Sequence, residues 1–415
     1  MKIFRKNIID NVIVFMLIMS TGGLLFIFNR NLMYAIFIGI LIFTVTFSSK
    51  IKKTAFRNII FCMLFLYFLF WINYLFGIPE QSVNKYLYYM VVILVSGLTL
   101  FHFLNNRTKH DFINSLYFVL KIFIIHAFFQ STLYLFFSDK LTDIQLKDYE
   151  CTTFYYLFFY ASTEVKKFSE ISFFGLDLMR NQGLFWEAGV AQLFFNIFFF
   201  LEAFIIKRSK LLLSLSVLVI LSTYSTIGIV LLLIQLLYYI LLENRSKRGI
   251  IFSVLLLFSI SSFVSYNIQE KTIGEKSASF QKRYFDLIQP FYIALKNPLT
   301  GVGLDLYIFQ EYRSNFYLQS NQSAFIEENL GLDLKMETTE EGSSNSFMYL
   351  LAAMGFPTAL MLIYFFLKNG LIDKREHLFI IILSLSLFSS PLLLRPFFVL
   401  LILAGFYRFC NRFSY

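Results

Sequence analysis

The sequence predicts an all-α polytopic membrane protein with about 12 transmembrane helices and two long extracytoplasmic loops. Of its 415 residues, 58% are hydrophobic and only 15% are charged. A soluble domain averages roughly 45–50% apolar residues and about 25% charged residues. The apolar runs are long and continuous, unlike the alternating strands of a transmembrane barrel. This composition excludes a soluble enzyme, a disordered chain and a secreted disulfide scaffold.

Each expected span is a run of apolar residues, because a helix needs roughly 20 of them to cross a bilayer core about 30 Å thick. The run 211–242 is too long for one span and is divided at Ser222–Gly228, while Pro391 and Pro396 divide the run 377–407. The basic N-terminus lacks a small-residue cleavage site, so we interpret it as part of a first span. In chain order, the expected spans are 9–28, 32–48, 58–77, 86–104, 113–137, 187–206, 211–225, 226–242, 250–266, 346–367, 377–391 and 394–407.

The distribution of basic residues predicts that both termini are cytoplasmic. In that orientation the cytoplasmic segments carry 20 Lys and Arg residues, and the short outer loops carry only Arg30, Lys85 and Arg395. This asymmetry follows the positive-inside rule. The net charge of +10 therefore reflects topology and not a nucleic-acid surface. The predicted organisation is helices 1–5 in 1–137, a loop at 138–186, helices 6–9 in 187–266, a large loop at 267–345, and helices 10–12 in 346–415.

No sequence motif indicates a metal or a cofactor. The three cysteines form no CxxC pair, and no two of the four histidines have metal-ligand spacing. A Walker motif and a dinucleotide-binding glycine fingerprint are also missing. We therefore expect no cofactor, and chemistry at the outer membrane face on a substrate that is activated elsewhere.

The first long loop contains a short apolar run, Thr153–Ala161, which cannot span a bilayer and is expected to be interfacial or re-entrant. The loop ends in Arg180–Glu187, which leads into the sixth span. Trp186 suits the aromatic belt of a membrane interface. From spacing alone, Arg180 and Glu187 fit an interfacial anchor and an acidic residue favoured by a helix N-terminus, and a functional role stays open.

The second long loop contains an amphipathic helix with a kink at Pro290. Its polar side carries Lys282, Arg283 and Asp286. Asn297–Asp305 follows, where glycines permit a tight turn. The simplest interpretation is a lid on the bilayer followed by an ordinary turn. The apolar positions of the helix are Phe280, Tyr284, Leu287, Ile288, Phe291 and Leu295.

Charged and polar residues inside the spans are few. Lys121 and Glu202 lie near cytoplasmic span ends, where snorkelling explains them as well as function does. His126 lies nearer the midplane and fits a hydrogen-bonded core histidine. Since the spans carry no ladder of carboxylates, the pattern disfavours a proton-coupled transporter.

Three local patterns together resemble the O-antigen polymerase and ligase superfamily of bacterial surface-glycan assembly. They are RNQGLFWEAG (Arg180–Gly189), NPLTGVG (Asn297–Gly303) preceded by Arg283, and SSNSFMYLLAAMGFPTALMLI (Ser343–Ile363). The resemblance implies a membrane-embedded fold of the GT-C glycosyltransferase type. Ligases of this superfamily typically carry a histidine where this chain has Ser344, which favours the polymerase branch.

The resemblance implies a metal-independent polysaccharide polymerase in the cytoplasmic (inner) membrane of a bacterium. It would join polyprenyl-pyrophosphate-linked oligosaccharide repeat units of an O-antigen or capsule at the outer face. Its implied partners are these lipid-linked glycans, membrane lipids, and a chain-length regulator and flippase of the same pathway, with no nucleic acid. Three alternatives stay open: an O-antigen ligase, a lipid-linked oligosaccharide flippase or other transporter, and a structural membrane component of a polysaccharide export complex.

The resemblance also assigns roles to individual residues. Arg180 and Arg283 would bind the pyrophosphate, because arginine is always ionised and binds phosphate oxygens bidentately. Glu187 would act as a general base or would hold an arginine. The residues expected to bind substrate are Lys282, Arg313, Asn345, Gly301 and Gly303.

Overall fold

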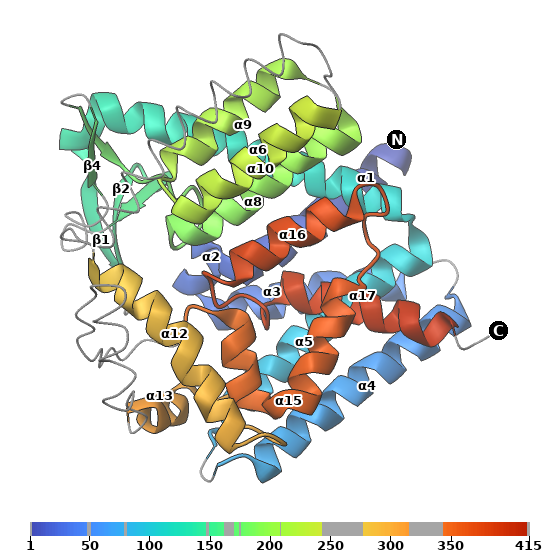
Figure 1. Cartoon of the computed structure of the whole chain (residues 1–415). Coiled ribbons are helices and arrows are strands. Elements are labelled where there is room, and N and C mark those ends of the chain that lie inside the picture. Colours follow the sequence, from blue (N-terminus) through green and yellow to red (C-terminus); the bar gives the residue numbers. More distant parts are fainter. Residues whose placement is uncertain are drawn as a thin grey trace. The chain divides into compact units, whose positions relative to one another are not determined.

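The computed structural model is mostly helical (Figure 1) and forms two compact units that interleave along the chain. The first unit comprises Met1–Ile40, Arg107–Asn267 and Ile372–Ser386, and the second comprises Leu41–Asn106, Ile268–Leu371 and Leu387–Tyr415. The residues that the structure describes are 2–47, 51–78, 81–146, 149–161, 170–173, 176–207, 209–242, 277–314 and 343–412.

The first unit is built around helix α8, Ala188–Phe200, which a π-helical turn, Leu201–Ile206, extends. Nearly every residue of α8 is buried, as expected for a helix that is apolar on all sides. It packs on α6, α9 and α10. The helices of this unit are α1 (Lys2–Gly22), α2 (Leu24–Phe28), α6 (Lys109–Phe137), α8, α9 (Lys210–Ser222), α10 (Thr226–Leu242) and α16 (Glu376–Leu387), and α3 (Arg30–Thr46) crosses into the second unit.

The run Thr153–Ala161, which is predicted to be interfacial or re-entrant, forms parts of two β-strands and the turn between them. Two strands pair around a tight turn at Tyr155 and Tyr156, both at positive φ. The Tyr160 side chain packs with Tyr134 of α6, so apolar residues are buried by a sheet and a helix together. The strands are β1 (Thr142–Leu146), β2 (Tyr149–Phe154) and β3 (Phe158–Ala161) in one antiparallel sheet, and β4 (Glu170–Phe173) and β5 (Leu176–Met179) in another. The all-α prediction is therefore incomplete for this loop.

In the second unit, helices from three distant parts of the chain lie side by side (Figure 1). Helix α17 packs on both α5 and α15, and α12 packs along α15. The predicted amphipathic helix is confirmed as α12, which runs on through Pro290. Helix α15 is broken at Gly355, where φ is 72°. The helices are α4 (Lys53–Phe76), α5 (Val83–Asn106), α12 (Ser277–Lys296), α13 (Leu306–Ser314), α15 (Ser346–Leu367) and α17 (Pro396–Arg412).

Both predicted breaks in long apolar runs are confirmed. Helix α9 ends at Ser222 and α10 begins at Thr226. Helix α16 ends at Leu387, and α17 begins with Pro396 at its first position, where a missing N–H does no harm. Five helices of the described residues are long and apolar enough to cross a membrane, and several shorter apolar helices accompany them. The expected span 250–266 lies outside the described residues.

Candidate functional site

Asn181 anchors the Arg180–Glu187 segment in the first unit. Its side-chain Nδ2 donates to the Ala127 carbonyl oxygen at 2.8 Å, to Ser131 Oγ at 2.7 Å and to Ser222 Oγ at 3.0 Å. Its Oδ1 accepts from the N–H of Gly183 at 3.0 Å. One amide thus ties the segment to α6 and to the end of α9.

Arg180 follows β5 and is half-buried. Its Nε donates to the carbonyl oxygen of Thr223 at 3.1 Å. Thr223 is the C-cap of α9, and carbonyl groups at a helix C-terminus attract cations. The structure therefore brings Arg180 to the predicted break Ser222–Gly228, at a residue 43 positions further along the chain.

The far end of the same segment pairs with the break between α1 and α2. The N–H of Leu24 donates to the Leu184 carbonyl oxygen at 2.9 Å, and the Trp186 N–H donates to the Gly22 carbonyl oxygen at 3.2 Å. Glu187 is the exposed N-cap residue of α8, and its carboxylate makes no capping hydrogen bond. This places Glu187 at a helix N-terminus, as predicted.

In the second unit, the glycine turn after α12 is bound to the broken part of α15. The N–H groups of Val302 and Gly303 each donate at 2.9 Å, to the carbonyl oxygens of Ala352 and Ala353. Those two carbonyls lie just before Gly355, where the helical pattern is interrupted.

Gly301 and Gly303 both have positive φ, 68° and 100°, a region that favours glycine. A Cβ on Gly301 would lie 2.5 Å from the Ala352 carbonyl oxygen, and one on Gly303 would overlap the Gln81 side chain. Both glycines are therefore required by contacts within the protein. Substrate contact by either glycine stays a prediction.

Three polar side chains from α4, α5 and the segment between them hold the turn in place. Tyr86 donates its hydroxyl to Asn73 Oδ1 at 2.6 Å and accepts from the Leu304 N–H at 3.0 Å. The amide of Asn73 donates to the Thr300 carbonyl oxygen at 2.7 Å. Gln81 donates to the Val302 carbonyl oxygen at 2.8 Å. No sequence motif singled out these residues, because they lie more than 200 positions from the turn.

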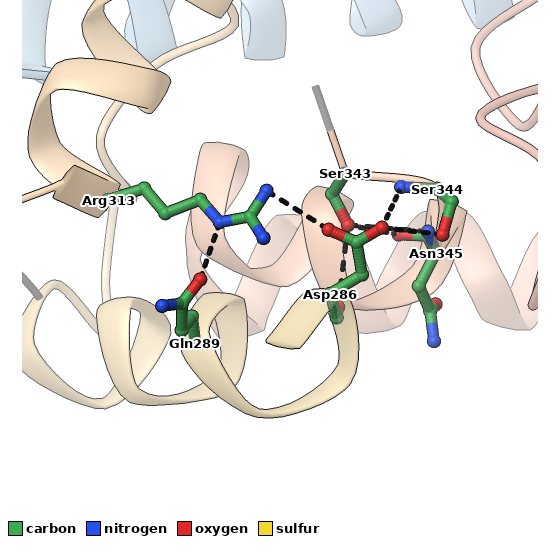
Figure 2. Close-up of polar contacts among 6 residues, drawn as sticks. All are labelled: Asp286, Gln289, Arg313, Ser343, Ser344 and Asn345. Atoms are coloured by element: carbon green, nitrogen blue, oxygen red, sulfur yellow. Dashed lines mark hydrogen bonds and ion pairs between the residues drawn. The ribbon is translucent and has the colours of Figure 1, made fainter. Parts of the chain in front are cut away.

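A buried ion pair joins α12 to α13 in the same unit (Figure 2). Arg313 Nη1 lies 3.0 Å from Asp286 Oδ1, and the two side chains are 4% and 0% exposed. Arg313 Nε donates to Gln289 Oε1. Burial of two charges requires such pairing, since each ion loses its hydration.

The other oxygen of Asp286 binds the mouth of α15. Asp286 Oδ2 accepts from the N–H of Ser344 at 2.8 Å and from its Oγ at 2.6 Å, as Figure 2 shows. Ser343 Oγ lies 3.4 Å from the Asp286 carbonyl oxygen. We call these five residues, Asp286, Gln289, Arg313, Ser343 and Ser344, the Asp286 cluster.

Asp286 was predicted on the polar side of its helix, and that side is covered at this position. The start of α15 and Arg313 of α13 close over the carboxylate. The ion pair with Arg313 offsets the cost of burying the Asp286 charge. The helical period of the sequence does not reveal that Asp286 is buried. Arg313, one of the predicted substrate-binding residues, is committed to this pair and to Gln289.

The other predicted residues of the second unit differ in exposure. Arg283 is exposed on α12, one turn before Asp286. Lys282 is its neighbour on the helix, and the Lys282 side chain lies outside the described residues. Asn345 is the buried N-cap of α15, and its Oδ1 accepts from the N–H groups of Phe347 and Met348 at 3.1 Å each. The side-chain oxygen Oδ1 thus caps the helix, and the predicted substrate contact would be made by the side-chain nitrogen Nδ2.

The predicted residues are divided between the two units. Arg180 and Glu187 belong to the first, and Arg283, Arg313, Asn345, Gly301 and Gly303 belong to the second. Within the described part of the chain, no three His, Cys, Asp or Glu side chains gather as a metal site. Taken unit by unit, the candidates are Arg180 and Glu187 in the first unit, and Arg283, Asn345, the two turn glycines and the Asp286 cluster in the second.

Comparison with known proteins supports one family. Residues 211–363, less than half of the chain, match the family model described as O-antigen ligase. No curated protein and no solved structure matches the chain. The matched region contains α10, α12 and α13 and most of α9 and α15, and it includes Arg283, the Asp286 cluster and Asn345. The match confirms the resemblance to the O-antigen polymerase and ligase superfamily. With the apolar helices, it indicates a multi-pass membrane protein with a region similar to O-antigen ligases.

Proposed function

We propose that the chain is a polymerase of polyprenyl-pyrophosphate-linked oligosaccharide repeat units at the outer face of the bacterial cytoplasmic membrane. The bond between the growing glycan and its lipid pyrophosphate breaks. A glycosidic bond forms to a hydroxyl of the next lipid-linked unit, which loses its proton, and the lipid pyrophosphate leaves. The family match supports the substrate class.

One observation favours a polymerase over a ligase. The residue before Asn345 at the mouth of α15 is Ser344, and its hydroxyl is bound to the buried carboxylate of Asp286. A hydroxyl in this position cannot take up a proton as a histidine does. The ligase alternative is kept because the matched family model is described as O-antigen ligase.

Arg180 and Arg283 are proposed to bind pyrophosphate oxygens, where negative charge develops as the glycan leaves. Preorganised positive charge of this kind stabilises a transition state. The contact of Arg180 with the Thr223 carbonyl oxygen fixes part of its guanidinium group. Arg283 is exposed and can meet a ligand without unfolding any part of α12.

Glu187 is proposed as the general base for the acceptor hydroxyl, or as the carboxylate that holds an arginine. Its exposure at the N-cap of α8 suits either role. A base must lie within hydrogen-bond reach of the proton that it removes. The two roles differ in proton transfer, since only a general base takes up a proton during each turnover.

The proposed topology has twelve spans, both termini in the cytoplasm, and the loops 138–186 and 267–345 outside. The lipid-linked substrate would reach the enzyme from the bilayer after a flippase has turned it outward. A chain-length regulator of the same pathway is a further proposed partner.

Deletion of the gene tests the proposal, with gel and mass analysis of surface and lipid-linked glycans. A single repeat unit in place of a ladder is the expected result. Full-length polymer left on its lipid carrier would identify a ligase. Repeat units trapped at the cytoplasmic face would identify a flippase and would end the proposed chemistry at the outer loops.

A further inference from the structure

The hydroxyl of Ser344 has a fixed direction. Ser344 Oγ donates its single proton to Asp286 Oδ2 at 2.6 Å, and the Ser344 N–H donates to the same oxygen at 2.8 Å. A hydroxyl carries one proton and two lone pairs. Once its proton is donated to a carboxylate, Ser344 Oγ can only accept further hydrogen bonds.

Of the three residues that precede α15, Ser344 is the least buried. Ser343 and Asn345 are buried, and Ser344 is half-buried. Figure 2 shows the Ser344 side chain turned toward Asp286 beside the first residues of α15. A group that forms a hydrogen bond with the Ser344 hydroxyl at this helix end must therefore be the donor.

Asp286 cannot take a proton from a substrate in this arrangement. Its side chain is fully buried, Oδ2 accepts both Ser344 donors, and Oδ1 faces Arg313 at 3.0 Å. Arg313 is itself held by Gln289. The role open to Asp286 is to hold Ser344.

We propose that Ser344 Oγ accepts a hydrogen bond from a hydroxyl or amide N–H of the lipid-linked glycan, and that Asp286 is the positioning residue that aims it. The inference rests on the proposed function for its substrate class. A phosphate group is disfavoured, because its oxygens would face the lone pairs of Ser344 and the carboxylate behind them. Ser344 would thus recognise sugar, whereas Arg180 and Arg283 are proposed to bind pyrophosphate.

The test uses the purified full-length protein in lipid nanodiscs and lipid-linked repeat units extracted from the gene-deletion strain. Binding and polymerisation are both measured for the wild type, Ser344→Ala, Ser344→Thr, Asp286→Asn and the double variant Ser344→Ala with Asp286→Asn. We expect Ser344→Ala to weaken binding about three- to tenfold, the effect of one lost hydrogen bond. Ser344→Thr keeps the hydroxyl and should retain near wild-type binding.

The double variant separates positioning from a general structural role. If Asp286 acts through Ser344, the double variant binds no more weakly than Ser344→Ala. Asp373→Asn is the matched control, because Asp373 forms an exposed pair with Lys109 in the first unit, and its binding should equal that of the wild type. Melting temperatures identify any variant that fails to fold. If Asp286→Asn fails to fold, the comparison of binding between Ser344→Ala and Ser344→Thr decides the proposal.

Three results would overturn the inference: unchanged binding by Ser344→Ala, equal loss in Ser344→Ala and Ser344→Thr, or losses that multiply in the double variant. Failure of the proposed function has a different signature. If the wild-type protein binds the repeat units without joining them, the polymerase proposal is wrong, and the comparison of binding among the Ser344 variants still tests the inference. A wild type that binds none of them would overturn both.

Discussion

The N–H of Val302 donates to the carbonyl oxygen of Ala352 at 2.9 Å, and this bond joins the glycine turn to α15 at its break. The regular helical hydrogen bonds of α15 are interrupted near Gly355, and N–H groups of the turn donate to the carbonyl oxygens of Ala352 and Ala353 instead. Each irregular segment thus satisfies the backbone of the other. The position of the turn, which follows the helix that carries Arg283, depends on this mutual fit.

Gly301→Ala should destabilise the protein by about 1–3 kcal/mol, because the new Cβ meets the Ala352 carbonyl oxygen at 2.5 Å and φ is 68°. Thermal unfolding of the solubilised protein measures the change. Gly39→Ala in α3 is the control, since nothing lies within 4 Å of its Cβ, and it should be neutral or slightly stabilising. Equal melting temperatures for the two variants would contradict the packing role of Gly301.

Arg313→Ala should cost about 3–5 kcal/mol of stability, because it leaves the fully buried Asp286 carboxylate without its partner. Lys109→Ala breaks an ion pair with Asp373 whose side chains are 49% and 68% exposed, and it should cost at most about 1 kcal/mol. Denaturant or thermal unfolding of both variants makes the comparison. Similar losses would mean that the Asp286 cluster is solvated in the working protein.

Arg180→Ala and Arg283→Ala should each lower polymerisation about a hundredfold, the usual effect of removing one transition-state contact. Lysine at either position should retain partial activity, since it keeps the charge and loses the bidentate geometry. Glycan ladders from a complemented deletion strain are the readout, with protein levels checked by immunoblot. Lys374→Ala, in a predicted cytoplasmic loop, serves as the control. Normal polymer length in both alanine variants would exclude the proposed clamp.

Cys151 should react slowly with a membrane-impermeant maleimide at pH 8. Burial in the sheet raises the pKa of its thiol to about 11, and only the thiolate is nucleophilic. The thiolate fraction at pH 8 is therefore about a thousandth, and labelling should rise as the pH approaches 11 or on unfolding. The measurement is made in a variant in which Cys62 and Cys410 are replaced by alanine.

Tyr156→Cys, combined with Cys151→Ala in the same background, is the positive control for that experiment. Tyr156 lies at the tip of the β2–β3 hairpin and is 73% exposed. Its cysteine should label rapidly on intact spheroplasts, because the proposed topology places residues 138–186 outside. Labelling only after the membrane is opened would reverse the proposed orientation.

Local patterns in the sequence determined many of the helices and several of their ends. A continuous apolar run or an amphipathic period is legible without knowledge of any partner, and so α12 and the five helices long and apolar enough to cross a membrane were predictable. The ends of α9 and α17 follow from a polar break and from Pro396, whose chemistry acts on its own neighbours. Arg180 and Glu187 were proposed from local sequence too, because they lie in one short motif.

The tertiary structure alone decided the environments of the polar residues. Asp286 has the sequence pattern of a solvated helix position, and it is buried because α13 and the start of α15 close over it. Thr153–Ala161 pairs as strands because its backbone finds partners in β1 and its Tyr160 finds Tyr134. Asn181 bonds to α6 and α9 across more than 40 positions. Such contacts depend on which distant segments meet, and neither hydropathy nor spacing along the chain contains that information.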